Sequence, residues 1–381
     1  MKIGINAMVL TARDLGVGIW IRGLIRALAR FDRENQYIVY HRPGVEPLAP
    51  EAPANFRFIK AGTIKNSRLT RIFWEQAVLP LHLVKEELDV LHCPAYVAPF
   101  RAQVPVLLTL HDLFVFSHPQ YCRFLNRLHY RFAMPVSIQH ATRIHCTSHW
   151  TRQSLFSSFP KNSEKARVIP PGVDDIFQAP DPADAEAYRI EKGLPENPFL
   201  FVGNIEPKKN ISGLLRAFAL LRHQHGSDRK LVMVGAHRGW GVDFKEEIER
   251  LHLGDEVITT GYVQRSELPL LYGMAFALVL PSAIEGFGIP PLEAMACGTP
   301  VVTSGMGGLS ESVGGAGIIV QDRRPASLAD SLHRIEERER LREKYSTVGK
   351  QRAERFRWDK IVSQFPPLYR ETARVGAQKK S

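Results

Sequence analysis

Two glutamates eight positions apart, Glu285 and Glu293, bracket a glycine-containing loop in the segment PSAIEGFGIPPLEAMACGTPVVT, residues 281–303. An ionised carboxylate accepts hydrogen bonds from two hydroxyl groups at once. The glycines of Glu285-Gly286-Phe287-Gly288 allow backbone N–H groups to approach a ligand closely, and a helix that starts there would bind an anion. The pair therefore suits a ligand with both a diol and a phosphate, such as a nucleotide sugar. In the plainer alternative, Glu293 is a solvated residue at a helix start and Glu285 is a charge on a loop.

The elements around the two glutamates can be read from the same segment. The apolar run Ala275–Leu280 predicts a buried strand. Pro290 and Pro291 suit a first helical turn, and we expect a helix over Leu292–Cys297 followed by a strand at Val301–Thr303. Glu293 would then lie in the first turn, where the helix dipole favours an acidic side chain. The segment predicts a strand, a glycine loop, a helix and a second strand.

The run E-G-F-G-I-P-P-L-E, followed by A-M-A-C-G-T-P-V-V, resembles the glutamate–seven–glutamate signature of retaining glycosyltransferases of family 4. The resemblance implies an α/β chain with the GT-B fold, in which two Rossmann-like parallel-sheet domains face a central cleft. It also implies that Glu285 faces the transferred sugar and that Glu293 binds the ribose hydroxyls of the donor. The further donor-binding residues that it implies in this segment are Gly286, Phe287, Gly288, Ile289 and Leu292.

Length, charge and cysteine usage limit the classes of protein. A chain of 381 residues with 44% hydrophobic residues is long enough for two domains. The formal net charge of +11 favours anionic partners such as nucleic acid, an anionic membrane or phosphorylated substrates. We expect no nucleic acid, because zinc-finger spacing and RRM-like aromatic motifs are missing. The four cysteines form no CxxC pair, which argues against a zinc site or a disulfide framework.

The N-terminal half alternates strand-like and helix-like runs, which predicts a parallel sheet covered on both faces. Its first strand, Lys2–Met8, leads through Gly16-Val17-Gly18 into an amphipathic helix over Ile19–Arg30. A glycine loop between a strand and a helix is typical of phosphate sites, although a plain tight turn explains it equally well. The family resemblance makes Gly16, Val17 and Gly18 a phosphate and acceptor loop.

His111 directly follows the apolar run Pro105–Leu110. Ligands of parallel sheets lie beyond the carboxyl ends of the strands, so its position suits a site, while an ordinary loop histidine is the alternative. The sequence T-L-H-D-L resembles the family's histidine that contacts the donor sugar. The sequence H-P-Q-Y at residues 118–121 resembles mannosyltransferase-like members.

We expect an acceptor-side domain over residues 1–175, completed by a C-terminal helix over 358–381, and a nucleotide-sugar-binding domain over 176–357. The sequence V-I-P-P-G-V-D at residues 168–174 resembles the family's interdomain crossing. Gln178–Pro198, rich in Pro, Asp, Ala and Glu, has the composition of a linker. Residues 326–345 predict one charged helix with a solvated face.

A lysine pair, Lys208 and Lys209, lies on the loop after the predicted strand Phe199–Val202. The alternative without a function is that both are ordinary surface lysines beside a helix. The resemblance implies that Lys209 neutralises the donor diphosphate, and that Lys208 or Asn204 stands where relatives have an arginine. Lysine is a point charge without the fork of arginine. The resemblance adds Gly203 beside this loop and, at the base-binding edge, Tyr262 and Val263.

Two stretches, Lys65–Glu87 and Tyr121–Phe132, mix basic with aromatic and aliphatic residues. Such mixtures suit helices at a membrane interface, and an ordinary amphipathic helix packed on the sheet is the alternative. The N-terminus lacks the apolar core and cleavage site of a signal peptide, and apolar runs fall short of the roughly 20 residues of a spanning helix. We expect a cytoplasmic protein, peripheral at the inner face of the cytoplasmic membrane if these stretches bind lipid.

The resemblance implies a retaining transfer with Glu285, His111 and Lys209 as the catalytic residues. A D-x-D triplet is missing, so we expect neither a metal nor another cofactor. The sequences G-N-I-E-P-K-K-N and T-L-H-D-L resemble members that use GDP-mannose, and the resemblance implies a polyprenyl-linked or surface-polysaccharide acceptor such as O-antigen. A GDP-deoxyhexose, a UDP-hexose and dTDP-rhamnose stay open as donors. A nucleotide-sugar epimerase and a non-catalytic binder are the alternative classes.

Overall fold

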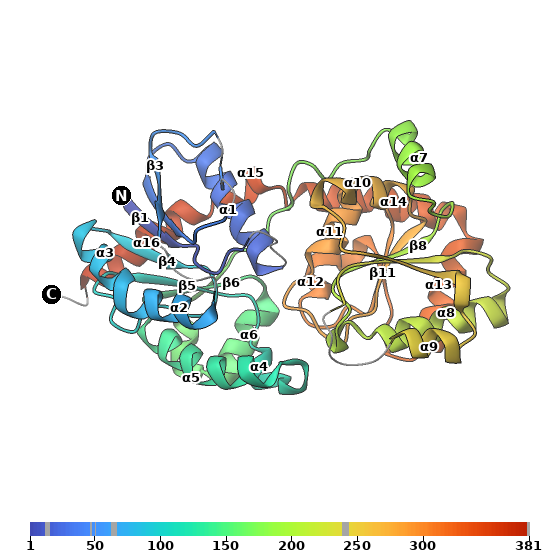
Figure 1. The fold of residues 1–381 in the computed structure, drawn as a ribbon, viewed down its shortest axis with the longest axis horizontal. Helices are drawn as coiled ribbons and strands as arrows, with labels where there is room; N and C mark the ends of the chain where they lie inside the picture. The colour runs from blue at the N-terminus through green and yellow to red at the C-terminus, as the bar shows by residue number, and fades with distance from the viewer. Residues whose placement is uncertain (12–15, 46–47, 50, 62–66, 238–243, 379–381) are drawn as a thin grey trace. The chain divides into compact units, whose positions relative to one another are not determined.

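The computed structural model describes residues 1–381 except 12–15, 46–47, 50, 62–66, 238–243 and 379–381 (Figure 1). The chain divides into two compact units. The first consists of Met1–Gly172 and Trp358–Ser381, and the second is Val173–Arg357. The division falls at Gly172, where we expected residue 175, and the C-terminal segment belongs to the first unit.

The first unit is built on a parallel sheet of seven strands in the order β3-β2-β1-β4-β5-β6-β7. The order reverses between β1 and β4, where Ile3 pairs with Tyr37 on one side and with Val90 on the other. Such a switch point is where doubly wound sheets bind ligands. The strands are β1 (Lys2–Asn6), β2 (Gln36–His41), β3 (Phe56–Lys60), β4 (Val90–Cys93), β5 (Val106–Leu110), β6 (Arg143–Cys146) and β7 (Ala166–Val168).

Helices cover this sheet, and α1 (Val17–Phe31) shows why they pack there. It buries Trp20, Ile21, Leu24 and Leu28, which share one helical face. The others are α2 (Arg68–Phe73), the π-helical η1 (Trp74–Val78), α3 (Leu79–Lys85), α4 (Phe114–Ser117), the 3-10 turns η2 (Pro119–Tyr121) and η3 (Pro160–Lys165), α5 (Phe124–His140), α6 (His149–Ser158), α15 (Trp358–Val362) and α16 (Phe365–Gln378).

The C-terminal segment is two helices, α15 and α16, and not the single helix that we expected. Trp358 of α15 fits against α1 because Gly23 has no side chain: a Cβ there would lie 2.6 Å from the indole nitrogen. Tyr369 of α16 contacts the buried ring of His92 at 2.9 Å. The end of the chain therefore completes the core of the first unit.

The second unit has a parallel sheet of six strands in the order β10-β9-β8-β11-β12-β13. Its switch point lies between β8 and β11, which pair directly through Ala277 and Phe199. The strands β8, β9, β11 and β12 are wholly buried, as expected of a sheet covered on both faces, whereas the edge strand β10 is largely not. The strands of this sheet are β8 (Phe199–Val202), β9 (Leu231–Val234), β10 (Val257–Gly261), β11 (Ala277–Leu280), β12 (Val301–Thr303) and β13 (Ile318–Ile319).

Two expectations for the helices of the second unit are wrong. Residues 178–198 contain a helix, α7 (Pro182–Glu191), which packs against α10. Residues 326–345 belong to two helices that meet at Arg338, and the first of them is buried through Leu328 and Leu332. The full set is α7, η4 (Pro207–Lys209), α8 (Ile211–His225), α9 (Phe244–Arg250), η5 (Gly254–Glu256), η6 (Arg265–Glu267), α10 (Leu268–Met274), α11 (Ile289–Ala296), α12 (Leu309–Val313), η7 (Gly314–Ala316), α13 (Pro325–Glu337) and α14 (Glu339–Glu354).

None of the helices within the described ranges has the length and apolar character needed to cross a membrane. Cys93, Cys122, Cys146 and Cys297 are all free thiols.

Candidate active site

The switch point of the second unit brings two loops together. One loop follows β8 and ends in the 3-10 turn η4 with the lysine pair, and the other follows β11 and carries Glu285. The amide of Ala283 donates a 2.7 Å hydrogen bond to the carbonyl of Lys208. Asn210, in the left-handed region at φ 55°, donates from its side chain to the carbonyl of Pro281 at 3.3 Å. These bonds fix the lysine loop against the glutamate loop.

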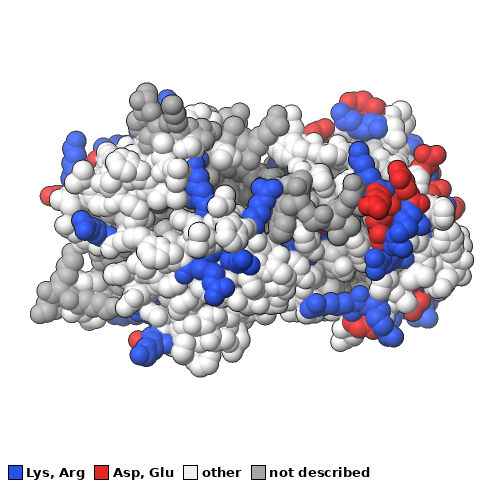
Figure 2. All heavy atoms as spheres, turned by 60° about the horizontal axis from the view of Figure 1, so that its bottom comes forward, with Lys and Arg blue, Asp and Glu red and all other residues white. Residues whose placement is uncertain are grey.

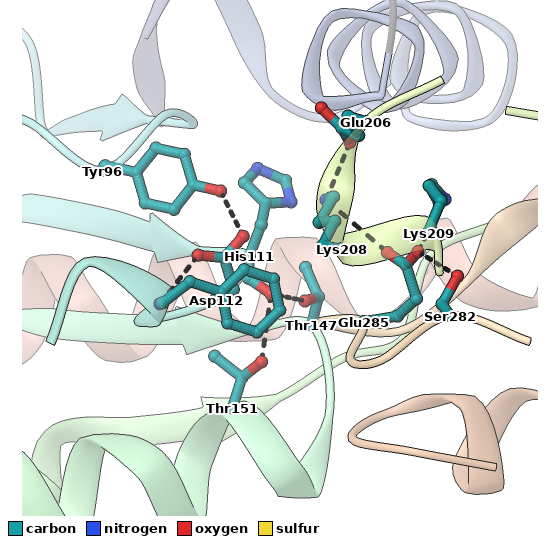
Figure 3. A network of polar contacts seen from close by, with 11 residues as sticks. Tyr96, His111, Asp112, Thr147, Thr151, Glu206, Lys208, Lys209, Ser282 and Glu285 are labelled. Carbon is teal, nitrogen blue, oxygen red and sulfur yellow. Dashed lines mark hydrogen bonds and ion pairs between the residues drawn. The ribbon is translucent and has the colours of Figure 1, made fainter. Parts of the chain in front are cut away.

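Glu285 is the centre of a buried charged cluster, shown in Figure 3. The ammonium of Lys209 donates to Oε1 at 2.6 Å, and the hydroxyl of Ser282 donates to the same oxygen at 2.9 Å. Lys208 lies 3.7 Å from Oε2 and 3.5 Å from Glu206. Glu285 and Lys209 are each only 8% exposed, so this pair is largely shielded from solvent.

Burial alone would raise the pKa of Glu285. The charges of Lys209 and Lys208 and the hydrogen bonds from Lys209 and Ser282 outweigh burial and lower this pKa to about 2. Glu285 is thus a carboxylate at neutral pH. It can accept hydrogen bonds and stabilise positive charge, but it has no proton to give.

Two glycines that we had not singled out hold the backbone of the glutamate loop. Gly307 has φ 68°, and a Cβ there would lie 2.3 Å from the carbonyl oxygen of Glu285. A Cβ on Gly308 would lie 2.2 Å from the carbonyl oxygen of Gly286, and the Gly308 amide donates to the Glu285 carbonyl at 2.8 Å. The close approach explains why side chains are excluded here.

The start of α11 differs from the expectation. The helix begins at Ile289, preceded by Gly288 at φ 96°, and incorporates both prolines. Since proline has no N–H, Pro290 and Pro291 leave the amide of Ile289 as the donor among the first three helical positions. Glu293 falls in the second turn and is 2% exposed. The helix dipole, which favours acidic residues in the first turn, therefore does not explain the position of Glu293, contrary to our expectation.

Glu293 is held from two sides by residues that the sequence analysis missed. Arg265 lies 2.8 Å from Oε1, and the hydroxyl of Tyr272 donates to Oε2 at 3.1 Å. The same guanidinium contacts Asp174 at 2.9 Å. Burial raises the pKa of Glu293, and the charge of Arg265 opposes that rise. In the sequence, Arg265 was indicated only by its position two residues after Val263, at the expected nucleobase-binding edge.

The other expected donor residues also lie at the carboxyl ends of β8, β10 and β11. A Cβ on Gly203 would meet Cε of Lys209 at 3.3 Å, and Asn204 beside it is half-buried. Tyr262 after β10 is exposed, and Val263 packs partly on the core. The side chains of Phe287, on the glutamate loop, and Leu292, on α11, are buried in the hydrophobic core and fix the loop and the helix to it.

His111, in the first unit, directly follows β5 (Figure 3). Its Nε2 donates to the carbonyl of Pro94 at 2.9 Å, and its ring packs edge-on against Trp20. Burial lowers its pKa to about 4, although the bond to Pro94 works in the opposite direction. A neutral ring that donates from Nε2 presents Nδ1 as an acceptor.

The glycine loop of the first unit is described only in part. Gly16 precedes α1 with φ 50°, Val17 is the first helical residue, and Gly18 is buried in the first turn. A Cβ on Gly16 would meet no atom within 4 Å, so glycine is favoured there by the backbone angle. Residues 12–15, which complete the loop, lie outside the described ranges.

The geometry thus gathers Glu285, Lys208 and Lys209 in one cluster and places Glu293 beside Arg265, all in the second unit; His111 and Gly16 belong to the first. Across the described parts of both units, no three His, Cys, Asp or Glu side chains form a group that could hold a metal ion.

Comparison with known proteins decides the family. Residues 16–176 match the family described as Glycosyltransferase Family 4, and residues 184–352 match Glycosyl transferases group 1. The chain belongs to glycosyltransferase family 4. It is 29% identical to O-antigen chain mannosyltransferase B of Escherichia coli over 74% of each chain.

Further relatives differ in what their names say they transfer to. The chain is 30% identical to O-antigen chain mannosyltransferase RfbU of Salmonella typhimurium over 65% of each chain. It is 33% identical to D-inositol 3-phosphate glycosyltransferase of Streptomyces bingchenggensis over 61% of this chain. The matched segments span 65% of RfbU and 54% of the inositol phosphate enzyme.

Solved structures show the same fold across nearly the whole chain. Sucrose-phosphate synthase from Thermosynechococcus elongatus superposes with a TM-score of 0.77 at 22% identity, covering 97% of this chain and 98% of that one. Anabaena HepE, in complex with UDP and glucose, gives 0.74 at 20% identity over 96% and 98% of the two chains. This glycosyltransferase therefore has the GT-B fold of two Rossmann-like domains.

Proposed function

We propose that this glycosyltransferase moves mannose from GDP-mannose, with retention of configuration, onto a lipid-linked or surface-polysaccharide glycan. The observation that carries the proposal is the buried cluster of Glu285, Lys209, Lys208 and Ser282 at the switch point of the second unit. The naming of two relatives as O-antigen mannosyltransferases supports the choice of sugar and acceptor.

In this proposal the lysines bind the donor diphosphate. An ammonium has three N–H donors, so Lys209 can keep its bond to Glu285 and still donate to a phosphate oxygen. The amide of Ile289 at the start of α11 adds a donor and the positive end of a helix dipole. Negative charge grows on the diphosphate as it leaves, and fixed positive groups in a buried site stabilise that charge strongly. The same groups take the place of a metal ion in the proposed reaction.

The carboxylates bind the two ends of the donor. Glu285 accepts hydrogen bonds from the hydroxyls of the transferred sugar, and Glu293 accepts them from the ribose. The bond between the anomeric carbon and the diphosphate oxygen breaks, and an acceptor hydroxyl attacks from the same face. Its oxygen forms the new glycosidic bond, and a donor phosphate oxygen takes its proton. We assign His111 a sugar contact through Nδ1, and Gly16, Val17 and Gly18 a contact with phosphate or acceptor.

We also propose that the first unit rests on an anionic membrane surface. On α5, Phe124, Leu125, Leu128 and Phe132 are between 63% and 70% exposed. That helix contains neither Asp nor Glu, and Arg127 and Arg131 interleave with the apolar residues. On the face drawn in Figure 2, the charged side chains of the first unit are mostly Lys and Arg. Apolar side chains flanked by basic ones suit a lipid interface with anionic head groups.

Neighbouring elements of the first unit extend this surface. Leu69 and Phe73 of α2 and Leu81 of α3 are exposed by two thirds or more. Arg68 of α2 donates a 2.7 Å hydrogen bond to Asn126 of α5, so the helices lie side by side. We call the exposed residues of α2, α3 and α5 the apolar-basic face.

The test is to incubate the protein with GDP-mannose, with and without membranes that carry lipid-linked acceptors. A mannosyltransferase releases GDP in step with acceptor mannosylation and only slowly without acceptor. An epimerase would change the sugar of the donor, and a binder would leave it intact. Transfer only from UDP-hexose, dTDP-rhamnose or a GDP-deoxyhexose would overturn the proposed donor while keeping the reaction class.

A further inference from the structure

Arg265 joins three parts of the second unit. Its Nη1 lies 2.8 Å from Oε1 of Glu293 on α11, and its Nε and Nη2 donate to Oδ2 of Asp174 at 3.1 and 2.9 Å. Its guanidinium carbon lies 4.7 Å from the centre of the Phe177 ring. The fork of the side chain is thus fixed on both edges and on one face, and the group cannot turn without breaking buried contacts.

We propose that Arg265 is a positioning residue for donor binding, which keeps the Glu293 carboxylate ionised and aimed at the ribose of the nucleotide. This inference rests on the proposed function, in which Glu293 binds the ribose hydroxyls. It adds a residue that the glutamate–seven–glutamate signature does not contain.

The need for such a partner follows from burial. Glu293 is 2% exposed, and an isolated buried carboxylate takes up a proton to avoid the cost of desolvated charge. A protonated carboxyl would present a donor on one oxygen and could no longer accept from two ribose hydroxyls. With Arg265 on Oε1 and Tyr272 on Oε2, each oxygen keeps a second lone pair for a ligand.

The other titratable groups that face Glu293 make Arg265 the decisive one. Burial raises the pKa of Glu293, and the charge of Asp174 raises it further. Tyr272 of α10 donates a hydrogen bond, and Cys297, directly after the end of α11, interacts as a buried thiol. Among the described groups with the largest effects on Glu293, the positive charge comes from Arg265. Without it, the carboxyl would hold its proton to a higher pH.

Asp174 fixes Arg265 from the side opposite Glu293. It lies two residues after the end of the first part of the first unit, and its carbonyl accepts a 3.1 Å hydrogen bond from Nη1 of Arg357, where the chain leaves the second unit. The guanidinium of Arg265, which orients the Glu293 carboxylate, is therefore anchored through Asp174 to both ends of the second unit.

The experiment measures the affinity for GDP and UDP by calorimetry across a pH series. The variants are Arg265→Ala, Arg265→Lys, Glu293→Gln and the double variant Arg265→Ala with Glu293→Gln. Arg250→Ala is the matched control, because Arg250 also pairs with a glutamate of the same unit, Glu247, at 2.8 Å but lies on α9. Thermal melting of each variant without ligand checks that it folds.

We expect Arg265→Ala to weaken binding about tenfold or more at neutral pH, since its removal leaves a buried carboxylate unpaired. The loss of affinity on acidification should set in at higher pH in Arg265→Ala than in the wild type. Arg265→Lys, which retains the charge without the fork, should weaken binding less and keep the wild-type pH dependence. The double variant should bind no more weakly than Glu293→Gln alone, because Arg265 acts through Glu293.

Three outcomes would overturn the inference: wild-type affinity in Arg265→Ala, an unshifted pH dependence, or effects of the two single changes that simply add. Should Arg265→Ala fail to fold, the pH dependence of Arg265→Lys decides, since a shift like that expected for the alanine variant would contradict the role of the charge. Full affinity in Glu293→Gln would instead contradict the proposed ribose role itself, and the two failures are thereby distinguished.

Discussion

The ammonium of Lys209 donates a 2.6 Å hydrogen bond to the carboxylate of Glu285, a residue 76 positions further along the chain. The two side chains meet because β8 and β11 are neighbours in the sheet and their following loops are tied together. Both residues are buried, so removing one partner leaves a buried charge that is poorly compensated. Several consequences of this pair can be measured.

Glu285→Gln should lower the turnover number by about 100-fold or more, because a neutral amide stabilises developing charge far less than a carboxylate does. Glu293→Gln should act mainly on donor affinity. Steady-state kinetics with GDP-mannose, varied donor and fixed acceptor separate the two effects. Equal changes in KM and kcat for both variants would contradict the separate roles of the two glutamates.

Lys209→Ala should destabilise the second unit by about 3 kcal/mol, because it leaves the Glu285 carboxylate buried without its nearest partner. The double variant Lys209→Ala with Glu285→Gln should recover part of that loss, because the stranded charge is gone. Unfolding in urea, followed by circular dichroism, gives both values. Lys344→Ala on α14 is a control in which the lysine is exposed, and it should change stability little.

The Glu285 pair should also show in acid. The pKa of Glu285 is lowered from 4.5 to about 2 in the folded protein, so the unfolded chain takes up the proton first. The stabilisation is complete above the unfolded pKa and is lost as the pH falls through the folded one. Between these two values the wild type should lose more unfolding free energy than Glu285→Gln does. Parallel pH curves for the two proteins would show that the pair contributes no such stability.

The core of the first unit should respond to acid at a higher pH. His145 donates from Nε2 to the carbonyl of Ile169 at 2.8 Å, so its Nδ1 accepts from the hydroxyl of Thr109 at 3.0 Å. Thr109 in turn accepts from His92 at 2.8 Å, and the hydroxyl of Tyr369 donates to the other nitrogen of His92. Each ring must be neutral for this chain of hydrogen bonds to hold.

Burial lowers the pKa of His145 from 6.5 to about 3. The unfolded chain binds the proton first as the pH falls below 6.5, so this histidine reduces stability progressively on acidification. His145→Gln, which keeps a donor and an acceptor but cannot titrate, should lose less stability over that range. Melting temperatures in a pH series test this, and an equal slope for both proteins would contradict the neutral-ring arrangement.

The apolar-basic face should bind anionic vesicles. The wild type should sediment with vesicles that contain phosphatidylglycerol, less with neutral ones, and little at about 1 M salt, where charge attraction is screened. Leu128→Ser combined with Phe132→Ser should weaken the binding. Ile190→Ser is a matched control, since Ile190 is 64% exposed but lies on α7 of the second unit. Vesicle binding that is unchanged by salt and by the combined Leu128→Ser and Phe132→Ser substitutions would exclude this face as the membrane-binding surface.

The sequence predicted the parts of the fold that local patterns determine. Apolar runs identified β5 (Val106–Leu110) and β8 (Phe199–Val202) to the residue, because a strand buried on both faces needs no alternation. The composition of residues 178–198 suggested a linker and concealed α7. Asp181 and Pro182 there are in fact a helix cap and a first helical residue.

What the sequence could not supply was contacts between distant loops. The pattern of E-G-F-G predicted a ligand site beside Glu285, but Lys209 became its partner only through the pairing of β8 with β11. Arg265 and Asp174 each look like ordinary loop charges in the sequence. The contacts of Arg265 with Glu293 on one side and Asp174 on the other depend on tertiary packing, which no local pattern records.

The most direct test is the calorimetric binding of GDP, UDP, dTDP and ADP to the wild-type protein, with magnesium and with a chelator. We expect GDP to bind most tightly and with the same affinity without magnesium, because Lys208, Lys209 and the start of α11 supply the positive charge. Tighter binding of UDP or dTDP would contradict the donor. Loss of binding with the chelator would contradict the metal-independent site, and failure of all four nucleotides to bind would contradict the active site itself.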